Sequence, residues 1–136
     1  MRKPIASGSF TVKITPQPAQ ADVGDPGIGR MGLHKVFEGG LVGEARGQML
    51  AMRTPVDGSA VYVALDRFEG ELDGRRGGFS LHHRGVMDAG VAVLEVWVAP
   101  DSGSGELTGL RGKLDIRVEG KEHYYQLDYS LPASNA

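Results

Sequence analysis

Apolar and polar residues alternate with a period of two along much of this chain, and this pattern constrains the fold more than any other feature. In residues 111–119, Leu114, Ile116 and Val118 alternate with charged residues. Successive side chains of a β-strand point to opposite faces, so the alternation predicts strands with one buried face. No segment of ten or more residues shows the apolar period of a helix. The sequence therefore predicts an all-β protein.

Turn signals divide the alternating pattern into eight expected strands. Gly39-Gly40, Ala89-Gly90 and Gly120-Lys121 supply the positive φ that tight hairpins need. The chain has 21 glycines, and a glycine within a strand often marks a bend where a sheet curls. We expect a small closed barrel, with two packed sheets as the alternative. The expected strands are Gly8–Thr15, Arg30–Glu38, Leu41–Met52, Ser59–Leu72, Gly78–Asp88, Val91–Ala99, Gly112–Glu119 and Glu122–Leu131.

Length and composition predict a single domain over residues 1–136. A chain of 136 residues with 40% hydrophobic and 24% charged residues is typical of a globular protein with a real core. Residues 16–29 contain three prolines and three glycines, which predicts an irregular loop. Residues 100–111 are expected to be a second loop, with one helical turn as an alternative. Residues 132–136 are expected to form a flexible tail.

Several function classes are excluded by the sequence. A net charge of −2 gives no electrostatic footprint for nucleic acid, and no apolar run is long enough for a membrane helix. The absence of cysteine excludes disulfides, thiolate catalysis and cysteine zinc sites. Adjacent His82 and His83 point to opposite faces, so we expect no metal site. We expect a cytoplasmic protein without a cofactor.

The hairpin expected over Ser59–Asp88 is the most informative segment for function. Parity places Tyr62, Asp66 and His83 on one face together with apolar residues. A two-residue turn at Gly74-Arg75 puts Asp66 directly opposite His83, and a shifted turn changes the partner but keeps the faces. Titratable groups on a core-facing surface are costly unless they are paired, so this face predicts a site.

The residues of this face suggest acid–base chemistry or ligand binding. Asp66 can fix the tautomer of His83 and make it a general base, while Tyr62 can orient a ligand oxygen. The alternative is a structural network that pins the barrel interior. Lys35 offers a counter-ion for a carboxylate ligand. The predicted ligand-binding residues are Lys35, Phe37, Met49, Phe68, Tyr125 and Tyr129, with ordinary core packing as the alternative for the two tyrosines.

Sequence runs spread over residues 5–131 resemble a known family. These runs are Lys35–Gly43, Gly47–Leu50, Gly58–Ala64, Phe79–His83, Pro100–Leu107 and Tyr125–Tyr129. Together they resemble a bacterial family catalogued as a domain of unknown function with an allene oxide cyclase-like (calycin-like) β-barrel. The resemblance implies an eight-stranded antiparallel up-and-down barrel and a homo-oligomer, either a dimer or a trimer. It implies no activity, and the active-site motif of the plant cyclases finds no residue-by-residue match here.

Three functions follow from this reading. The first is a barrel that binds a small apolar, partly oxygenated molecule in its interior. The second is an isomerase or cyclase that acts on such a ligand, with His83 as the acid–base group, Asp66 as its orienter and Tyr62 as an electrophilic helper. The third is a non-catalytic interaction protein with a filled interior, for which Trp97 on the outer face suggests a subunit contact.

Overall fold

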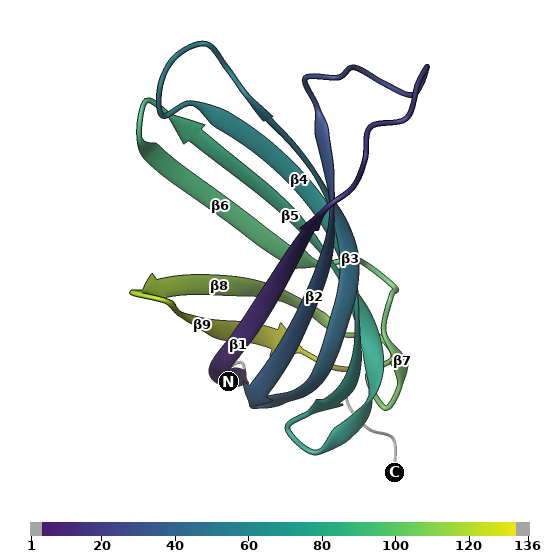
Figure 1. Cartoon of the computed structure of the whole chain (residues 1–136). Helices are drawn as coiled ribbons and strands as arrows, with labels where there is room; N and C mark the ends of the chain where they lie inside the picture. The colour runs from purple at the N-terminus through teal and green to yellow at the C-terminus, as the bar shows by residue number, and fades with distance from the viewer. Residues whose placement is uncertain (1–3, 133–136) are drawn as a thin grey trace.

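The computed structural model describes residues 4–132, which form β-strands joined by turns and loops (Figure 1). Residues 133–136 of the expected tail lie outside the described part of the chain. Among residues 4–132 no helix is long and apolar enough to cross a membrane. The strands are β1 (Ile5–Pro16), β2 (Gly29–Gly39), β3 (Leu41–Arg53), β4 (Ala60–Leu72), β5 (Arg75–Asp88), β6 (Val91–Val98), β7 (Ser104–Gly105), β8 (Arg111–Glu119) and β9 (Glu122–Ser130).

Eight of these strands close into an antiparallel barrel. The neighbours run in the order β4, β3, β2, β1, β9, β8, β6 and β5, and pairing of β4 with β5 completes the ring. The ninth strand, β7, adds a short bridge to the start of β5. The predicted all-β, eight-stranded antiparallel barrel is therefore confirmed, and the two-sheet alternative is wrong because one continuous ring of pairs joins all eight strands.

The turn of the β4–β5 hairpin lies one residue earlier than the sequence suggested. Leu72 pairs with Arg75, so the turn is Asp73-Gly74, and both residues have positive φ (48° and 84°). Aspartate tolerates the left-handed region better than most residues, which allows this tight turn. Asp66 consequently pairs with Leu81, and the predicted pairing with His83 is wrong. The faces predicted by parity are unchanged.

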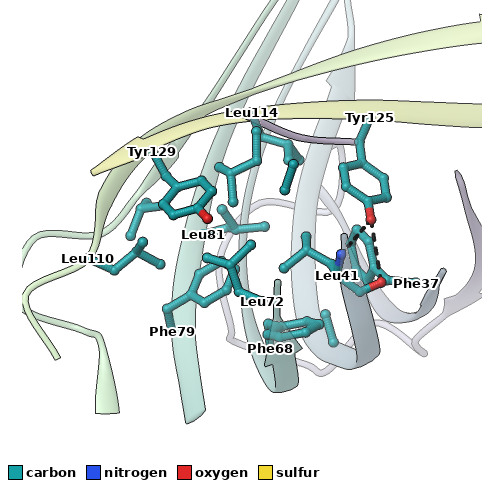
Figure 2. Packing of buried hydrophobic residues seen from close by; sticks show 14 of the residues in the cluster. Phe37, Leu41, Phe68, Leu72, Phe79, Leu81, Leu110, Leu114, Tyr125 and Tyr129 are labelled. Atoms are coloured by element: carbon teal, nitrogen blue, oxygen red, sulfur yellow. Dashed lines mark hydrogen bonds between the residues drawn. The ribbon is translucent and has the colours of Figure 1, made fainter. Parts of the chain in front are cut away.

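One end of the barrel is filled by a packed hydrophobic core (Figure 2). Phe37, Phe68 and Phe79 form a chain of aromatic contacts, with ring centroids 5.7 Å and 5.0 Å apart. Leu41, Leu72 and other inward-facing residues fill the space around them. We call this the closed end, and it leaves no room for a ligand.

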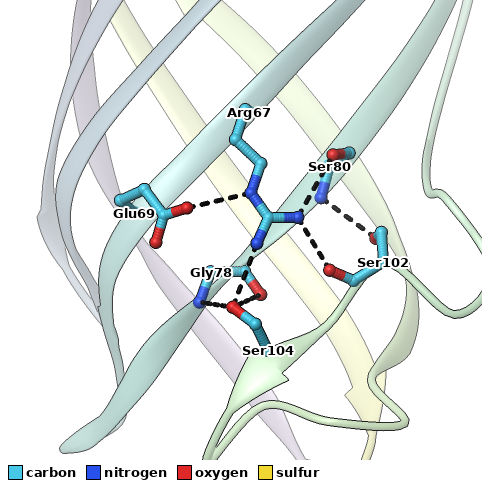
Figure 3. Close-up of polar contacts among 6 residues, drawn as sticks. All are labelled: Arg67, Glu69, Gly78, Ser80, Ser102 and Ser104. Atoms are coloured by element: carbon cyan, nitrogen blue, oxygen red, sulfur yellow. Dashed lines mark hydrogen bonds and ion pairs between the residues drawn. The ribbon is translucent and has the colours of Figure 1, made fainter.

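The segment between β6 and β8 covers the closed end. Leu107 and Leu110 from this segment are fully buried beneath the barrel core. Arg67 on the outer face of β4 holds the segment in place, because its guanidinium donates to the Ser102 carbonyl (2.7 Å) and the Ser104 hydroxyl (3.0 Å), as Figure 3 shows. The sequence predicted a loop here and did not indicate that the loop supplies core residues.

Two tyrosines of β9 lock the closed end through their hydroxyl groups. The Tyr125 hydroxyl accepts from the Leu41 amide (2.8 Å) and donates to the Glu38 carbonyl (2.8 Å), which fixes the β2–β3 turn. The Tyr129 hydroxyl donates to Asp73 (2.6 Å) in the β4–β5 turn. Burial, followed by the hydrogen bond to Asp73, raises the pKa of Tyr129 to about 12. Both tyrosines therefore join β9 to hairpin turns on the other side of the barrel.

The opposite end of the barrel is open on one side. β6 and β8 share a single pair, Trp97 with Lys113, and β6 then runs away from the β8–β9 hairpin (Figure 1). We call this weak junction the β6–β8 seam and the splayed region the open end. Trp97 lies on the outer face, 44% exposed, with the Lys113 ammonium 5.6 Å from its ring centroid. The expected homo-oligomer stays a prediction.

The covering role of the β6–β8 segment predicts that its buried leucines matter for stability. We expect Leu110→Ala to lower the free energy of unfolding by about 2–5 kcal/mol, because it leaves a cavity in the closed end. Urea unfolding followed by circular dichroism measures this. Leu50→Ala is the matched control, since Leu50 is 47% exposed, and we expect a change within about 0.5 kcal/mol. Equal effects of the two substitutions would contradict the covering role.

Candidate functional site

Asp66 and His83 meet diagonally across the β4–β5 hairpin. His83 pairs in the sheet with Ala64, one pleat from Asp66, and its side chain reaches back so that Nε2 lies 3.2 Å from Asp66 Oδ1. Diagonal neighbours on one face of an antiparallel pair are within reach when one side chain is long. Both residues are buried, 3% and 5% exposed. The register change in the turn therefore leaves the two groups in contact.

Lys35 completes the cluster from a strand that is not adjacent to β4. Its Nζ lies 2.7 Å from Asp66 Oδ2 and 3.4 Å from His83 Nε2, although β3 separates β2 from β4. At this level the inward face of β3 carries only Ala45 and Gly47, and these residues are small enough for the lysine side chain to pass over the strand. We call Lys35, Asp66 and His83 the ionic cluster. Within residues 4–132 they are the buried lysine, aspartate and histidine side chains, and no other Lys, Arg, Asp, Glu or His is buried.

Gly47 is required by the close approach of Asp66. A Cβ added at Gly47 would lie 2.5 Å from Asp66 Cβ and 2.0 Å from the Leu65 carbonyl oxygen. Backbone atoms cannot move away from such a clash, so no larger residue fits at this position without shifting β4. The glycine therefore belongs to the construction of the ionic cluster.

The electrostatics of Asp66 favour its charged form. Burial alone would raise the pKa of this carboxyl group, but the hydrogen bond from His83 and the charge of Lys35 outweigh it, and the pKa is lowered. With its proton on Nε2, His83 donates to the carboxylate and keeps Nδ1 as an acceptor. No cluster of three or more metal-ligating side chains occurs within residues 4–132.

A cavity of about 600 Å³ lies at the open end of the barrel. Its inner wall is formed by side chains from β2 to β6 that parity places on the inward face, and Arg53 and Gly27 lie at its rim. Leu33 and Ala64, both buried, lie one pleat further in at the level of His83, and Lys35 and Asp66 lie one pleat beyond them. The inward-facing lining residues are Met31, Met49, Ala51, Ala60, Tyr62, Gly85, Met87, Ala92 and Leu94.

Tyr62 lines the cavity on the same face of β4 as Asp66. Its ring packs on Gly85 of the neighbouring strand, where an added Cβ would lie 2.1 Å from Tyr62 Cε1. Gly85 thus provides the space that the ring occupies. Burial first, and then the negative charge of Asp66, raises the pKa of Tyr62, so the phenol feels the carboxylate. Within residues 4–132 the Tyr62 hydroxyl has no hydrogen-bond partner.

Comparison with known proteins places the chain in a family. The sequence profile of a family described as "Protein of unknown function (DUF3224)" matches residues 6–129. The chain belongs to the DUF3224 family. It is also similar to the crystal structure of a protein with unknown function from the DUF3224 family of Shewanella oneidensis MR-1, with 41% sequence identity and a TM-score of 0.89. That match covers 98% of this chain and 100% of the other.

No curated protein matches the chain. Membership of DUF3224 confirms the resemblance to a family of unknown function that the sequence motifs indicated. Because DUF3224 carries no activity by description, any function must be argued from the cavity and the ionic cluster.

The structure separates the predicted ligand-binding residues into three groups. Met49 lines the cavity, and Lys35 belongs to the ionic cluster beyond it. The other four lie in the closed end, where neighbouring rings and backbone groups contact them, and their ligand-binding role stays a prediction. These four are Phe37, Phe68, Tyr125 and Tyr129. Asp66 pairs with the Lys35 ammonium group, and the role of Lys35 as a counter-ion for a carboxylate ligand also stays a prediction.

Sequence reasoning missed most of the cavity wall. Met31, Met87 and Leu94 line it from three different strands. Each lies on the inward face of its strand, at the strand end that meets the open end of the barrel. The signal was available in the parity of these residues, combined with the position of each along its strand.

The lowered pKa of Asp66 predicts a specific pH dependence of stability. We expect Asp66→Asn to cost about 3–5 kcal/mol near pH 7, because Lys35 loses its buried partner. A carboxyl group with a lowered pKa stabilises fully above its ordinary pKa and loses this contribution as the pH falls through the lower folded value. The difference between wild type and variant should therefore be constant down to about pH 5 and shrink below about pH 4.

Urea unfolding at a series of pH values measures this difference. Asp115→Asn is the control, since Asp115 is exposed and lies 3.9 Å from Lys113 on the surface. We expect that control to change stability by less than about 1 kcal/mol at any pH. A wild-type advantage over Asp66→Asn that persists unchanged at pH 3 would show that Asp66 is not held in its charged form.

Proposed function

We propose that the protein binds a small, largely apolar molecule in the cavity at the open end of the barrel. The observation that carries this proposal is the coexistence of a packed closed end with a hollow open end. A volume of about 600 Å³ lies within the range of small-molecule sites, which is roughly 300–1,000 Å³.

The chemistry of the wall supports an apolar ligand. Methionines from β2, β3 and β5 face the cavity, and their flexible thioethers adapt to ligands of irregular shape. Small residues such as Ala51, Ala60 and Ala92 leave room between them. Tyr62 supplies a polar group on the inner side. Apolar walls with few polar groups are the usual composition of a ligand pocket.

Filling the cavity should abolish binding. We expect Ala51→Phe to weaken binding of the uncharged fluorescent probe N-phenyl-1-naphthylamine at least tenfold, because the new ring occupies the ligand volume. Fluorescence titration measures the dissociation constant. Leu50→Phe is the matched control, since the adjacent residue points to the outer face and is exposed. Failure of the wild type to bind the probe, or equal binding by both variants, would contradict the proposal.

A second candidate function is acid–base catalysis on the same ligand. It is favoured by the hydrogen bond between Asp66 and His83, which leaves Nδ1 of the imidazole as a potential base. Two observations favour binding instead. None of the three residues of the ionic cluster lines the cavity, and the Asp66 charge is already shared with Lys35.

Deuterium exchange separates the two functions. If His83 acts as a base, it removes a proton from the carbon next to a ligand carbonyl, and a deuteron from heavy water replaces it on the same carbon. We expect wild-type protein to leave the α-protons of bound 2-undecanone unexchanged, as followed by mass spectrometry. Exchange that is present in wild type and lost in His83→Gln would favour catalysis.

Two finer expectations stay predictions. One is the likeness to the allene oxide cyclase and calycin barrels, and the other is the cytoplasmic location. The third function, an interaction protein with a filled interior, is weakened because the filling is limited to the closed end.

A further inference from the structure

The Lys35–Asp66 pair offers a ligand no net charge to neutralise. The positive charge of Lys35 and the negative charge of Asp66 lie 2.7 Å apart and balance each other. The described chain buries no other carboxylate and no other lysine or arginine. Neither charge of this pair is therefore free for a ligand.

The inner end of the cavity is unfavourable for an anion. Tyr62 is the polar side chain at that end, and an uncharged phenol offers no positive charge to an anion. A carboxylate placed beside Tyr62 would lose its hydration without gaining a cationic partner. Drawing Lys35 toward such a ligand would unpair Asp66 in a buried environment, which is strongly unfavourable. Arg53 lies at the solvent-exposed rim, where water and salt screen its charge.

The Tyr62 hydroxyl is suited to an uncharged oxygen atom. It is a donor without a partner in residues 4–132, and it is held at the cavity wall because its ring packs on Gly85. A ketone oxygen or an alcohol can accept a hydrogen bond from this group without bringing a charge into the barrel. The Tyr62 hydroxyl is accessible to water, so a ligand oxygen exchanges a bond to water for a direct hydrogen bond, with a modest net gain.

We propose that the ligand is an uncharged oxygenated amphiphile, such as a medium-chain ketone or alcohol, and that the site rejects the carboxylate of the same chain length. In the bound state the chain lies against the methionines and the oxygen accepts from Tyr62. The balanced Lys35–Asp66 pair is the element that sets this selectivity. The inference rests on the proposed function, because it concerns the same cavity.

Competition between two ligands of equal length tests the selectivity directly. Bound N-phenyl-1-naphthylamine is displaced with 2-undecanone or with undecanoate near neutral pH. We expect the ketone to bind at least tenfold more tightly than the carboxylate. Equal or tighter binding of undecanoate, or probe binding that neither ligand displaces, would overturn the inference while the cavity remains a binding site. Absence of any probe binding would instead contradict the proposed function.

Two charge variants test whether the ionic cluster sets the selectivity. Asp66→Asn leaves the Lys35 charge uncompensated, so the affinity ratio of ketone to carboxylate should fall at least tenfold. Adding Lys35→Met to Asp66→Asn removes both charges and should restore the preference for the ketone. Circular dichroism confirms that each variant is folded before binding is measured. A ratio that stays the same in both folded variants would show that the cluster does not act on the ligand.

A third variant tests the hydrogen bond from Tyr62. Tyr62→Phe should weaken 2-undecanone about threefold to tenfold, which is the usual net contribution of one hydrogen bond. Tyr124→Phe is the matched control, since the Tyr124 ring packs on Arg117, away from the cavity, with the guanidinium carbon 4.9 Å from its centroid. An unchanged ketone affinity in Tyr62→Phe would exclude this tyrosine as the group that recognises the oxygen.

Discussion

The ion pair between Lys35 and Asp66 divides the barrel interior into a packed part and an open part. Burying two charges is costly, and a pair that spans three strands is tolerated only when each atom has a partner. Here His83 occupies the second carboxylate oxygen, and β3 contributes residues small enough for the lysine to pass. On the side of the closed end, aromatic rings fill the interior. On the side of the open end, the wall is apolar and the space is open.

The two ends of the barrel are built by different means. At the closed end, Tyr125 and Tyr129 connect β9 to hairpin turns across the interior, and a loop anchored by Arg67 inserts two leucines. At the open end, β6 and β8 share one pair, and β1 continues past its last pair with β9 while it stays paired to β2. Rigidity is therefore concentrated where no ligand is held, and the cavity borders the less constrained part of the sheet.

Alternation and turn residues were sufficient to predict the strands, because side-chain parity depends on local backbone geometry alone. They placed Asp66 and His83 on one face, since a shift of the turn by one residue moves both partners together and preserves the faces. Parity says nothing about height along the barrel axis, however. Phe37 and Met31 share a face of β2, yet the first lies in the packed core and the second lines the cavity. The role of Lys35 was missed for a related reason, because its partner lies two strands away in the sheet.

The β6–β8 seam gives this barrel a built-in line of weakness. With one pair joining the two strands, the backbone groups along the facing edge of residues 91–96 lack the ladder that protects other strands. Amide hydrogens on that edge should exchange with solvent long before those of β3 or β4. The same edge is rich in valine and leucine, which makes it the place where a misfolded or concentrated sample would begin to stack into fibrils. If the proposed ligand enters beside β6, ligand entry and resistance to aggregation place opposite requirements on this one short strand.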